Sequence, residues 1–392
     1  MSTYQIVILA PAGLPQAEML RKTIERRFSD LGIAPQLLVF FDEVTVGTRD
    51  KKSPTIAAYF GLTATSPSAT AALIDIIDEA VIVLPVVSQL DGFNHYVPRE
   101  LSAINGMALR SEDPALEQVA SVLLEGLGLL RKNRRLFISY RRMETRAIAI
   151  QVYELLDSQG FDVFLDSHSI RPGEPFQEVL WHRLADTDVV VLLDSPGFLG
   201  SRWTEEELAH ANSTNLQILQ IVWPGNVLPA IAAFSTPFAL DQRDFFDPND
   251  RLGETARLRD ACLSKMAIEV ESLRARALAA RHSYLVHEFI SEVTSAGFLP
   301  LLQPDRYIQF QTKSGESYIT VPTVGVPDAI RYQEIEDEIN KQPKVHGGII
   351  LLFDERGIRD KWMDHLGWLD RQKLAVKSLQ VAKAQAWLGG LA

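Results

Sequence analysis

The sequence predicts an α/β protein whose strands form parallel sheets covered by helices on both faces. Short apolar runs such as "VVVLLD" at 189–194 alternate with segments in which apolar residues recur at helical spacing. Most of these runs are apolar throughout, which is typical of strands buried on both faces. The alternation continues from residue 4 to about residue 260 of a 392-residue chain, so more than one domain is expected.

In the first third of the chain, strands are expected at 4–10, 36–41 and 81–87. A helix joins the first two strands. We expect it to end at Gly32, because glycine commonly follows the last helical turn. A polar loop and then a helix at 69–80 are expected before the third strand. Two further helices are expected at 99–109 and 114–130, and the basic run "RKNRR" at 131–135 is interpreted as a junction.

The pattern restarts after this junction. Strands are expected at 135–140, 161–166, 188–194 and 216–224, with helices at 145–160 and 175–187. A long helix to Ser295 follows, then a hairpin around Ser314 and Gly315, a buried strand at 347–354 and a helical tail to about residue 388. These patterns divide the chain into domains at 1–132, 133–262 and 263–392.

Two of these domains share an internal repeat. Residues 78–106 and 186–213 both show an acidic start, an apolar strand, a polar loop and an aromatic residue four positions before a glutamate. The pairs are Tyr96 with Glu100 and Trp203 with Glu207. Pro98 interrupts the first pair, so we expect chemistry only at the second. The third domain shows a weaker likeness, with Trp362 but no glutamate four residues later.

Composition narrows the class of protein. A hydrophobic content of 46% and a charged content of 23% suit a globular chain. The formal net charge of -11 disfavours a general nucleic-acid coat, which needs a basic stripe. The single cysteine, Cys262, allows neither an internal disulfide nor a cysteine-based zinc site. Neither a signal peptide nor an apolar run of membrane-spanning length is evident, so a cytoplasmic protein without membrane contact is expected.

Four motifs of the middle domain occur in a characteristic order. They are "LFISYRR" (136–142), "GFDVFLDSHSIRPGEPF" (160–176), "VVVLLDSPGFLGSRW" (189–203) and "EEELAHA" (205–211). Together they resemble a TIR domain, of the Toll/interleukin-1 receptor type, over roughly residues 133–260. The resemblance implies a flavodoxin-like parallel sheet, flanked here by two divergent TIR-like or Rossmann-like α/β domains.

The resemblance also implies a chemistry. Enzymatic TIR domains cleave the nicotinamide–ribose bond of NAD⁺, and the glutamate that they need corresponds to Glu207. A carboxylate there can stabilise the ribosyl cation that forms when an N-glycosidic bond breaks. No metal or resident cofactor is expected, since NAD⁺ is the substrate. The residues expected to bind it are Trp203, Tyr140, Arg141, Arg142, Asp166 and Phe176.

Other interpretations of the same residues stay open. Thr204 and Glu207 also form a capping box, and Glu205 and Glu206 suit the first turn of a helix. The chain is then a non-catalytic TIR adaptor, or a receptor for a nucleotide signal. For the catalytic hypothesis the family implies prokaryotic immune (anti-phage) defence or signalling and self-association through TIR domains. A small-molecule or protein activator, sensed by the flanking domains, fits the same hypothesis.

Overall fold

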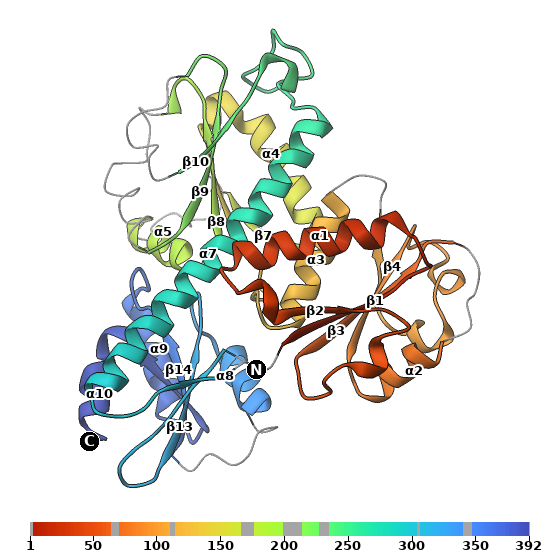
Figure 1. The fold of residues 1–392 in the computed structure, drawn as a ribbon. Coiled ribbons are helices and arrows are strands. Elements are labelled where there is room, and N and C mark those ends of the chain that lie inside the picture. Colours follow the sequence, from red (N-terminus) through yellow and green to blue (C-terminus); the bar gives the residue numbers. More distant parts are fainter. Residues whose placement is uncertain are drawn as a thin grey trace. The chain divides into compact units, whose positions relative to one another are not determined.

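The computed structural model of the chain describes residues 3–63, 70–109, 114–165, 176–198, 214–226, 235–303, 306–339 and 347–391. It contains three five-stranded sheets with helices packed against them (Figure 1). The predicted α/β class is therefore confirmed. The chain forms two compact units, one of residues 1–133 with 260–276 and the other of residues 134–259 with 277–392.

The first sheet is entirely parallel, with the order β2-β1-β3-β4-β5. Figure 1 shows α1 and α3 on one side of this sheet and α2 on the other. Its strands are β1 (Tyr4–Leu9), β2 (Leu38–Phe41), β3 (Thr55–Gly61), β4 (Ile82–Val87) and β5 (Met107–Ala108). Its helices are α1 (Pro15–Asp30), α2 (Ala71–Asp78) and α3 (Pro114–Gly126). Burial of β1 along its whole length agrees with its uninterrupted apolar sequence.

The second sheet is also entirely parallel, with the order β7-β6-β8-β9-β10. Its strands are β6 (Arg135–Ser139), β7 (Asp162–Leu165), β8 (Val189–Asp194), β9 (Gln217–Val222) and β10 (Thr236–Ala239), and its helices include α4 (Arg142–Ser158) and α5 (Phe176–Ala185). Counted along the chain, both sheets have the order 2-1-3-4-5, which is that of flavodoxin-like folds. The shared order accords with the internal repeat of the sequence.

The third sheet differs from the first two. Its strands lie in chain order, β11-β12-β13-β14-β15, and β11, β12 and β13 pair antiparallel while the rest are parallel. The strands are β11 (Leu301–Leu302), β12 (Ile308–Gln311), β13 (Ser317–Pro322), β14 (Gly348–Phe353) and β15 (Val376–Gln380), and the helices are α8 (Ala329–Ile339), α9 (Asp360–Asp370) and α10 (Ala384–Gly389). The hairpin predicted around Ser314 and Gly315 is confirmed by the pairing of β12 with β13.

Several sequence-based expectations about single elements are wrong. Strand β3 lies in the segment expected to be a polar loop, and β15 lies in the expected helical tail. Strand β10 was not expected. The helix expected at 99–109 is instead a short 3-10 turn, Arg99–Leu101, followed by β5. Pro98 precedes that turn and Gly106 follows it, so helix-breaking residues bound the segment on both sides.

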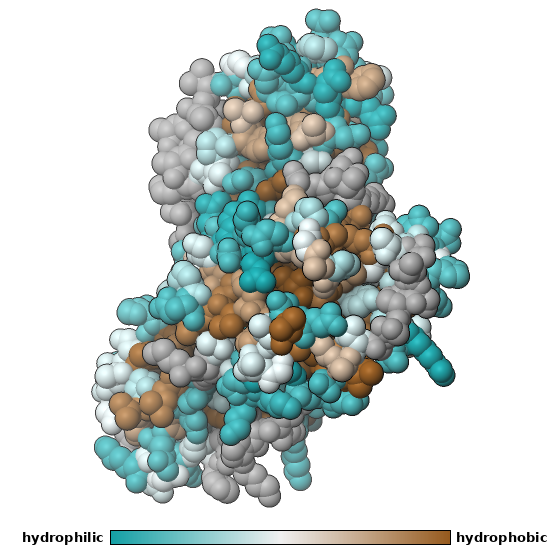
Figure 2. Space-filling view, turned by 45° about the vertical axis from the view of Figure 1, so that its right-hand side comes forward, coloured by the Kyte–Doolittle hydropathy of each residue, from teal (hydrophilic) through white to brown (hydrophobic). Residues whose placement is uncertain are grey.

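A single long helix, α7 (Asp260–Ser295), contributes to both compact units. In the space-filling view, hydrophilic residues make up most of the visible face, and hydrophobic residues are exposed in smaller patches (Figure 2). Within the part of the chain that the structure describes, no helix is both long enough and apolar enough to cross a membrane.

Candidate functional site

The residues that the TIR resemblance singles out belong to the carboxyl edge of the second sheet. Strands β6 and β8 are parallel neighbours, so their carboxyl ends meet at the same edge. The strand order reverses between them, and in open α/β sheets ligands bind in the crevice at such a switch point. Tyr140 and Arg141 follow β6, while Ser195, Gly197 and Phe198 follow β8.

Arg141 is held at this edge by Glu144. Its guanidinium lies 2.5 Å from one carboxylate oxygen of Glu144, and the other oxygen accepts a hydrogen bond of 3.0 Å from the backbone N–H of Gly197. A Cβ atom at Gly197 would overlap both the guanidinium of Arg141 and the carboxylate of Glu144. A side chain at residue 197 would therefore require the ends of Arg141 and Glu144 to move aside.

The first turn of α4 is irregular, which positions Glu144. Thr145 has φ -129° and ψ 16°, outside the helical region. Its backbone N–H and its hydroxyl both donate to the carbonyl oxygen of Arg141, at 2.9 and 3.2 Å. The carbonyl oxygen of Glu144 accepts from the N–H of Gly253 at 2.7 Å, and is thereby turned away from the helix. These bonds fix the turn that presents Arg141 and Glu144 to the β8 loop.

Asp194, the last residue of β8, is a buried carboxyl at the same edge. It is 1% exposed, and its burial raises its pKa, although a hydrogen bond from Gln220 opposes that shift. The amide of Gln220 donates to Oδ2 of Asp194 at 2.8 Å and accepts from the hydroxyl of Ser235 at 2.6 Å. Oδ1 of Asp194 and the hydroxyl of Ser195 are buried without a hydrogen-bond partner among the described residues.

The structure places some of the predicted site residues. Tyr140 is buried, at 7% exposed, directly after β6. Arg141 is half-buried in its ion pair, and Arg142 is exposed at the start of α4. Phe176 begins α5. Asp166, Trp203 and Glu207, together with the side chain of Phe176, lie outside the described residues, so their roles stay predictions.

Three residues of this edge were not predicted from the sequence. Glu144 could have been noticed as an acidic residue in the first turn after "SYRR", and Asp194 as a carboxyl that ends a wholly apolar strand. For Gly197 the signal is weaker, because a glycine in a loop indicates a turn as readily as a close contact. Glu100, the counterpart of Glu207 in the first domain, is exposed on its 3-10 turn.

Comparisons with known proteins agree with this edge being that of a TIR domain. Residues 136–256 match the TIR domain family. A protein of Brachypodium distachyon named "Probable 2' cyclic ADP-D-ribose synthase BdTIR" is 31% identical over 88 residues, which are 22% of this chain and 39% of that protein. The match therefore spans well under two thirds of that relative's length.

Matches to solved structures are distant. A glucose-galactose binding protein, GanP of Geobacillus stearothermophilus, is 10% identical with a TM-score of 0.20, over 72% of this chain and 93% of that one. A myo-inositol binding protein of Caulobacter is 11% identical with a TM-score of 0.19, over 57% of this chain and 75% of that one. Scores this low do not identify a common fold. The family match and the parallel 2-1-3-4-5 sheet together identify residues 136–256, the central third of the chain, as a TIR domain flanked by other α/β domains.

Proposed function

We propose that the TIR domain of this chain cleaves the nicotinamide–ribose bond of NAD⁺. The observation that carries the proposal is the TIR family match over a sheet whose carboxyl edge holds a fixed arginine, Arg141, beside buried polar groups. The Brachypodium relative, named as a probable 2' cyclic ADP-D-ribose synthase, supports NAD⁺ as the substrate class.

The proposed reaction breaks the bond between C1′ of the ribose and the ring nitrogen of nicotinamide. The bonding electron pair leaves with the nicotinamide, whose ring becomes neutral, and the ribose develops an oxocarbenium-like positive charge. The carboxylate of Glu207 stabilises that charge, as carboxylates do in glycoside hydrolysis. Water then attacks C1′ and releases a proton to give ADP-ribose. In the alternative, a hydroxyl or the adenine of the same molecule attacks and gives a cyclic product.

Charge complementarity gives Arg141 a role in this proposal. A pyrophosphate carries two negative charges, and guanidinium groups bind such oxygens with paired hydrogen bonds. Glu144 occupies one nitrogen of Arg141 and fixes its position, while 38% of the side chain stays exposed to solvent. Arg142, next along the chain and exposed, supplies a second positive charge. Tyr140, Asp166, Trp203 and Phe176 complete the proposed binding set.

The proposal extends to assembly and regulation. A TIR domain that associates head to tail forms open filaments unless the rotation closes a ring. We propose that such self-association, biased by the flanking domains or by an activator, switches cleavage on. A role in prokaryotic anti-phage defence or signalling is part of the same proposal and rests on the family alone.

Glu207→Gln tests the chemistry. We expect nicotinamide release from NAD⁺ by the concentrated full chain to fall by at least about a hundredfold, because one electrostatic stabiliser of a transition state is commonly worth that much. Glu206→Gln is the matched control, since it removes the same charge from the adjacent position, and we expect its rate within about twofold of the wild type.

Chromatography of the products distinguishes the outcomes. Release of ADP-ribose indicates water as the acceptor, and a cyclic isomer indicates attack within the molecule. Absence of nicotinamide release from concentrated or crowded wild-type protein would instead favour the adaptor hypothesis. Full activity in Glu207→Gln would show that the catalytic carboxylate is elsewhere.

A further inference from the structure

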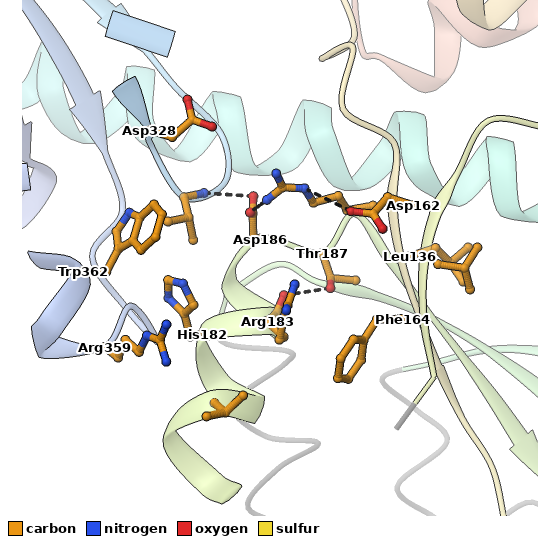
Figure 3. Close-up of a pocket in the computed structure, with 14 residues that line it drawn as sticks. Leu136, Asp162, Phe164, His182, Arg183, Asp186, Thr187, Asp328, Arg359 and Trp362 are labelled. Atoms are coloured by element: carbon orange, nitrogen blue, oxygen red, sulfur yellow. Dashed lines mark hydrogen bonds and ion pairs between the residues drawn. The ribbon is translucent and has the colours of Figure 1, made fainter. Parts of the chain in front are cut away.

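A cavity of about 670 Å³ lies at the opposite edge of the second sheet, where β6 and β7 begin (Figure 3). Its walls come from two domains of the same compact unit. The TIR domain contributes the starts of β6 and β7 and one side of α5, and the domain of the third sheet contributes the segments before α8 and at the start of α9. Cavities of this volume between domains are typical small-molecule sites.

The two domains are held together around the cavity. The backbone N–H of Val326 donates to Oδ1 of Asp186 at 3.1 Å. Arg281, on α7, donates from its guanidinium to the carbonyl oxygens of Ala185 and Thr187 at the end of α5. Ala185 also packs against the hydrophobic core of the third sheet. These contacts come from three separate segments, so the cavity is a built feature of the unit.

The carboxylates that line the cavity already have partners. Asp186 pairs with Arg135, and Asp162 lies 3.9 Å from the same guanidinium. Oδ1 of Asp328 accepts from the backbone N–H of Arg331 at 2.9 Å, as a cap of α8. In the described part of the chain, none of these three acidic groups forms an ion pair with the two other arginines of the cavity.

Those two arginines are Arg183, on α5, and Arg359, at the start of α9. Neither forms an ion pair with another residue in the part of the chain that the structure describes. Nε of Arg359 is buried, and no hydrogen-bond partner lies near it among the same residues. A buried, unpaired guanidinium nitrogen costs free energy unless a ligand or water satisfies it. Figure 3 shows His182 between these two side chains.

Two aromatic rings stand beside the arginines. The rings of His182 and Trp362 are 5.4 Å apart at an angle of 48°. The indole N–H of Trp362 donates to the carbonyl oxygen of Pro327 at 2.8 Å, which fixes its ring. Burial lowers the pKa of His182 to about 4, and the charges of Arg359, Arg183 and Arg135 contribute to that shift. His182 is therefore neutral at pH 7, and its Nδ1 is buried without a partner among the described residues.

We propose that this cavity binds a small anionic molecule that carries a planar ring, with the size and chemistry of a mononucleotide. Arg183 and Arg359 bind the phosphate, since guanidinium groups match phosphate oxygens in geometry and charge. Trp362 and His182 contact the planar ring. The site is separate from the carboxyl edge and does not depend on NAD⁺ cleavage.

Isothermal titration of the full-length chain with AMP tests the proposal. We expect AMP to bind, and adenosine, ribose 5-phosphate and inorganic phosphate each to bind at least about tenfold more weakly, because each lacks the ring or the anion. Equal affinity for AMP and phosphate would reduce the site to a simple anion site and overturn the ring assignment. No binding of AMP at millimolar concentration would overturn the proposal as a whole.

Substitutions then locate the bound nucleotide. Arg359→Gln is expected to weaken AMP binding by at least about tenfold, and Arg183→Gln, on an exposed position that folding tolerates, by a similar factor. Arg371→Gln is the matched control, because Arg371 is exposed at the other end of α9, and its Kd should stay within about twofold. Loss of binding in Glu207→Gln with full binding in Arg359→Gln would place the nucleotide at the carboxyl edge and overturn the proposal. The titration measures binding of AMP and needs no turnover of NAD⁺. A failure of this proposal can therefore be distinguished from a failure of the proposed NAD⁺ cleavage.

Discussion

At the residue scale, the geometry of the candidate site depends on a glycine, Gly197. Gly197 lets the loop after β8 approach α4 closely enough for its N–H to reach Glu144, whose other oxygen holds Arg141. The motif "SYRR" predicted an arginine at this edge, because the residue follows directly on a strand. The partner that fixes the arginine could not be predicted, because residues 144 and 197 meet only after the sheet forms.

Gly197→Ala tests this close approach. The added methyl group must displace the flexible ends of the Arg141 and Glu144 side chains and weaken the contacts that they make, so we expect a cost of about 1 kcal/mol, at the low end for overpacking. We expect the unfolding midpoint, followed by circular dichroism, to fall by about 2–4 °C, the shift that 1 kcal/mol produces in a unit of this size. Gly389→Ala is the control: a Cβ at Gly389 meets no atom within 4 Å and the position is helical, so its midpoint should stay the same or rise slightly. An unchanged midpoint in Gly197→Ala would mean that the loop after β8 moves aside freely.

A second prediction at this scale concerns Asp194 and the pH dependence of folding stability. Burial raises its folded-state pKa above the ordinary value of 3.8, so the folded protein holds this proton more tightly than the unfolded chain does. Stability is then lost as pH rises from 3.8 through the raised pKa. The side chain of Asp194→Asn cannot ionise. We therefore expect the unfolding midpoint of this variant, minus that of the wild type, to increase between pH 4 and pH 7 in circular dichroism melts.

A second aspartate supplies the control of opposite sign. Hydrogen bonds from the Thr45 side chain and backbone lower the pKa of Asp42, so ionisation of Asp42 contributes stability above pH 3.8 that is lost in acid. The unfolding midpoint of Asp42→Asn relative to the wild type should therefore fall as pH rises from about 2 to about 5, and stay level from there to pH 7. If the midpoint of Asp194→Asn minus that of the wild type also decreases with rising pH, the folded state stabilises the Asp194 charge and the prediction is wrong.

At the element scale, the sequence predicted the strands that are long and apolar and missed those that depend on their neighbours. Strand β8 is apolar throughout and was expected almost to the residue. Strand β3 contains two alanines and a glycine, residues that are depleted in strands, yet it is largely buried because β1 and β4 flank it. Strand β15 is short and half-buried, and Asp370 bonds both the backbone and the hydroxyl of Ser378. The apolar pattern of each strand alone does not reveal these partners.

Helix α5 gives the prediction at this scale. Arg281 donates to the carbonyl oxygen of Ala185, the last residue of α5, and to that of Thr187 just beyond it, an arrangement that suits the helix dipole. Arg281→Gln removes charge-assisted hydrogen bonds worth roughly 1.5–3 kcal/mol. We expect backbone amides in α5 to exchange with deuterium about tenfold faster, as measured by mass spectrometry. Arg276→Gln, an exposed position on the same helix, should leave the exchange of α5 unchanged. If Arg281→Gln also leaves it unchanged, other contacts hold that end of α5.

At the scale of the whole molecule, the sequence predicted three α/β segments, but the fold does not keep them separate along the chain. Residues 260–276, the first half of α7, belong to the compact unit of the first sheet. The sequence offers no sign of this, because a long amphipathic helix after the TIR segment suits either neighbour. Polar contacts, at least partly buried, join this segment to residues more than 100 positions earlier in the chain.

These contacts lie on the helical face of the first sheet. Arg274 is fully buried and bonds Glu125 at 2.9 Å, and Glu271 accepts from the hydroxyl of Ser121 at 2.8 Å. Ser272 donates to Asp30 at 3.1 Å. Removing one partner of a buried charge pair leaves the other uncompensated, which commonly costs several kcal/mol. The first sheet therefore needs the α7 segment to complete its own core.

A fragment experiment tests this dependence. We expect residues 1–133 alone to unfold at a markedly lower temperature than the same residues joined to 260–276 by a flexible linker, because the fragment exposes Glu125 and the apolar face that α7 covers. Circular dichroism melts of both proteins measure the difference. Arg274→Ala and Arg276→Ala in the joined protein form a matched pair: the buried Arg274 should matter and the exposed Arg276 should not. An equal unfolding midpoint with and without residues 260–276 would show that the first sheet does not need α7. The domain boundary that the sequence predicts at residue 132 would then be the boundary of an independently folding domain.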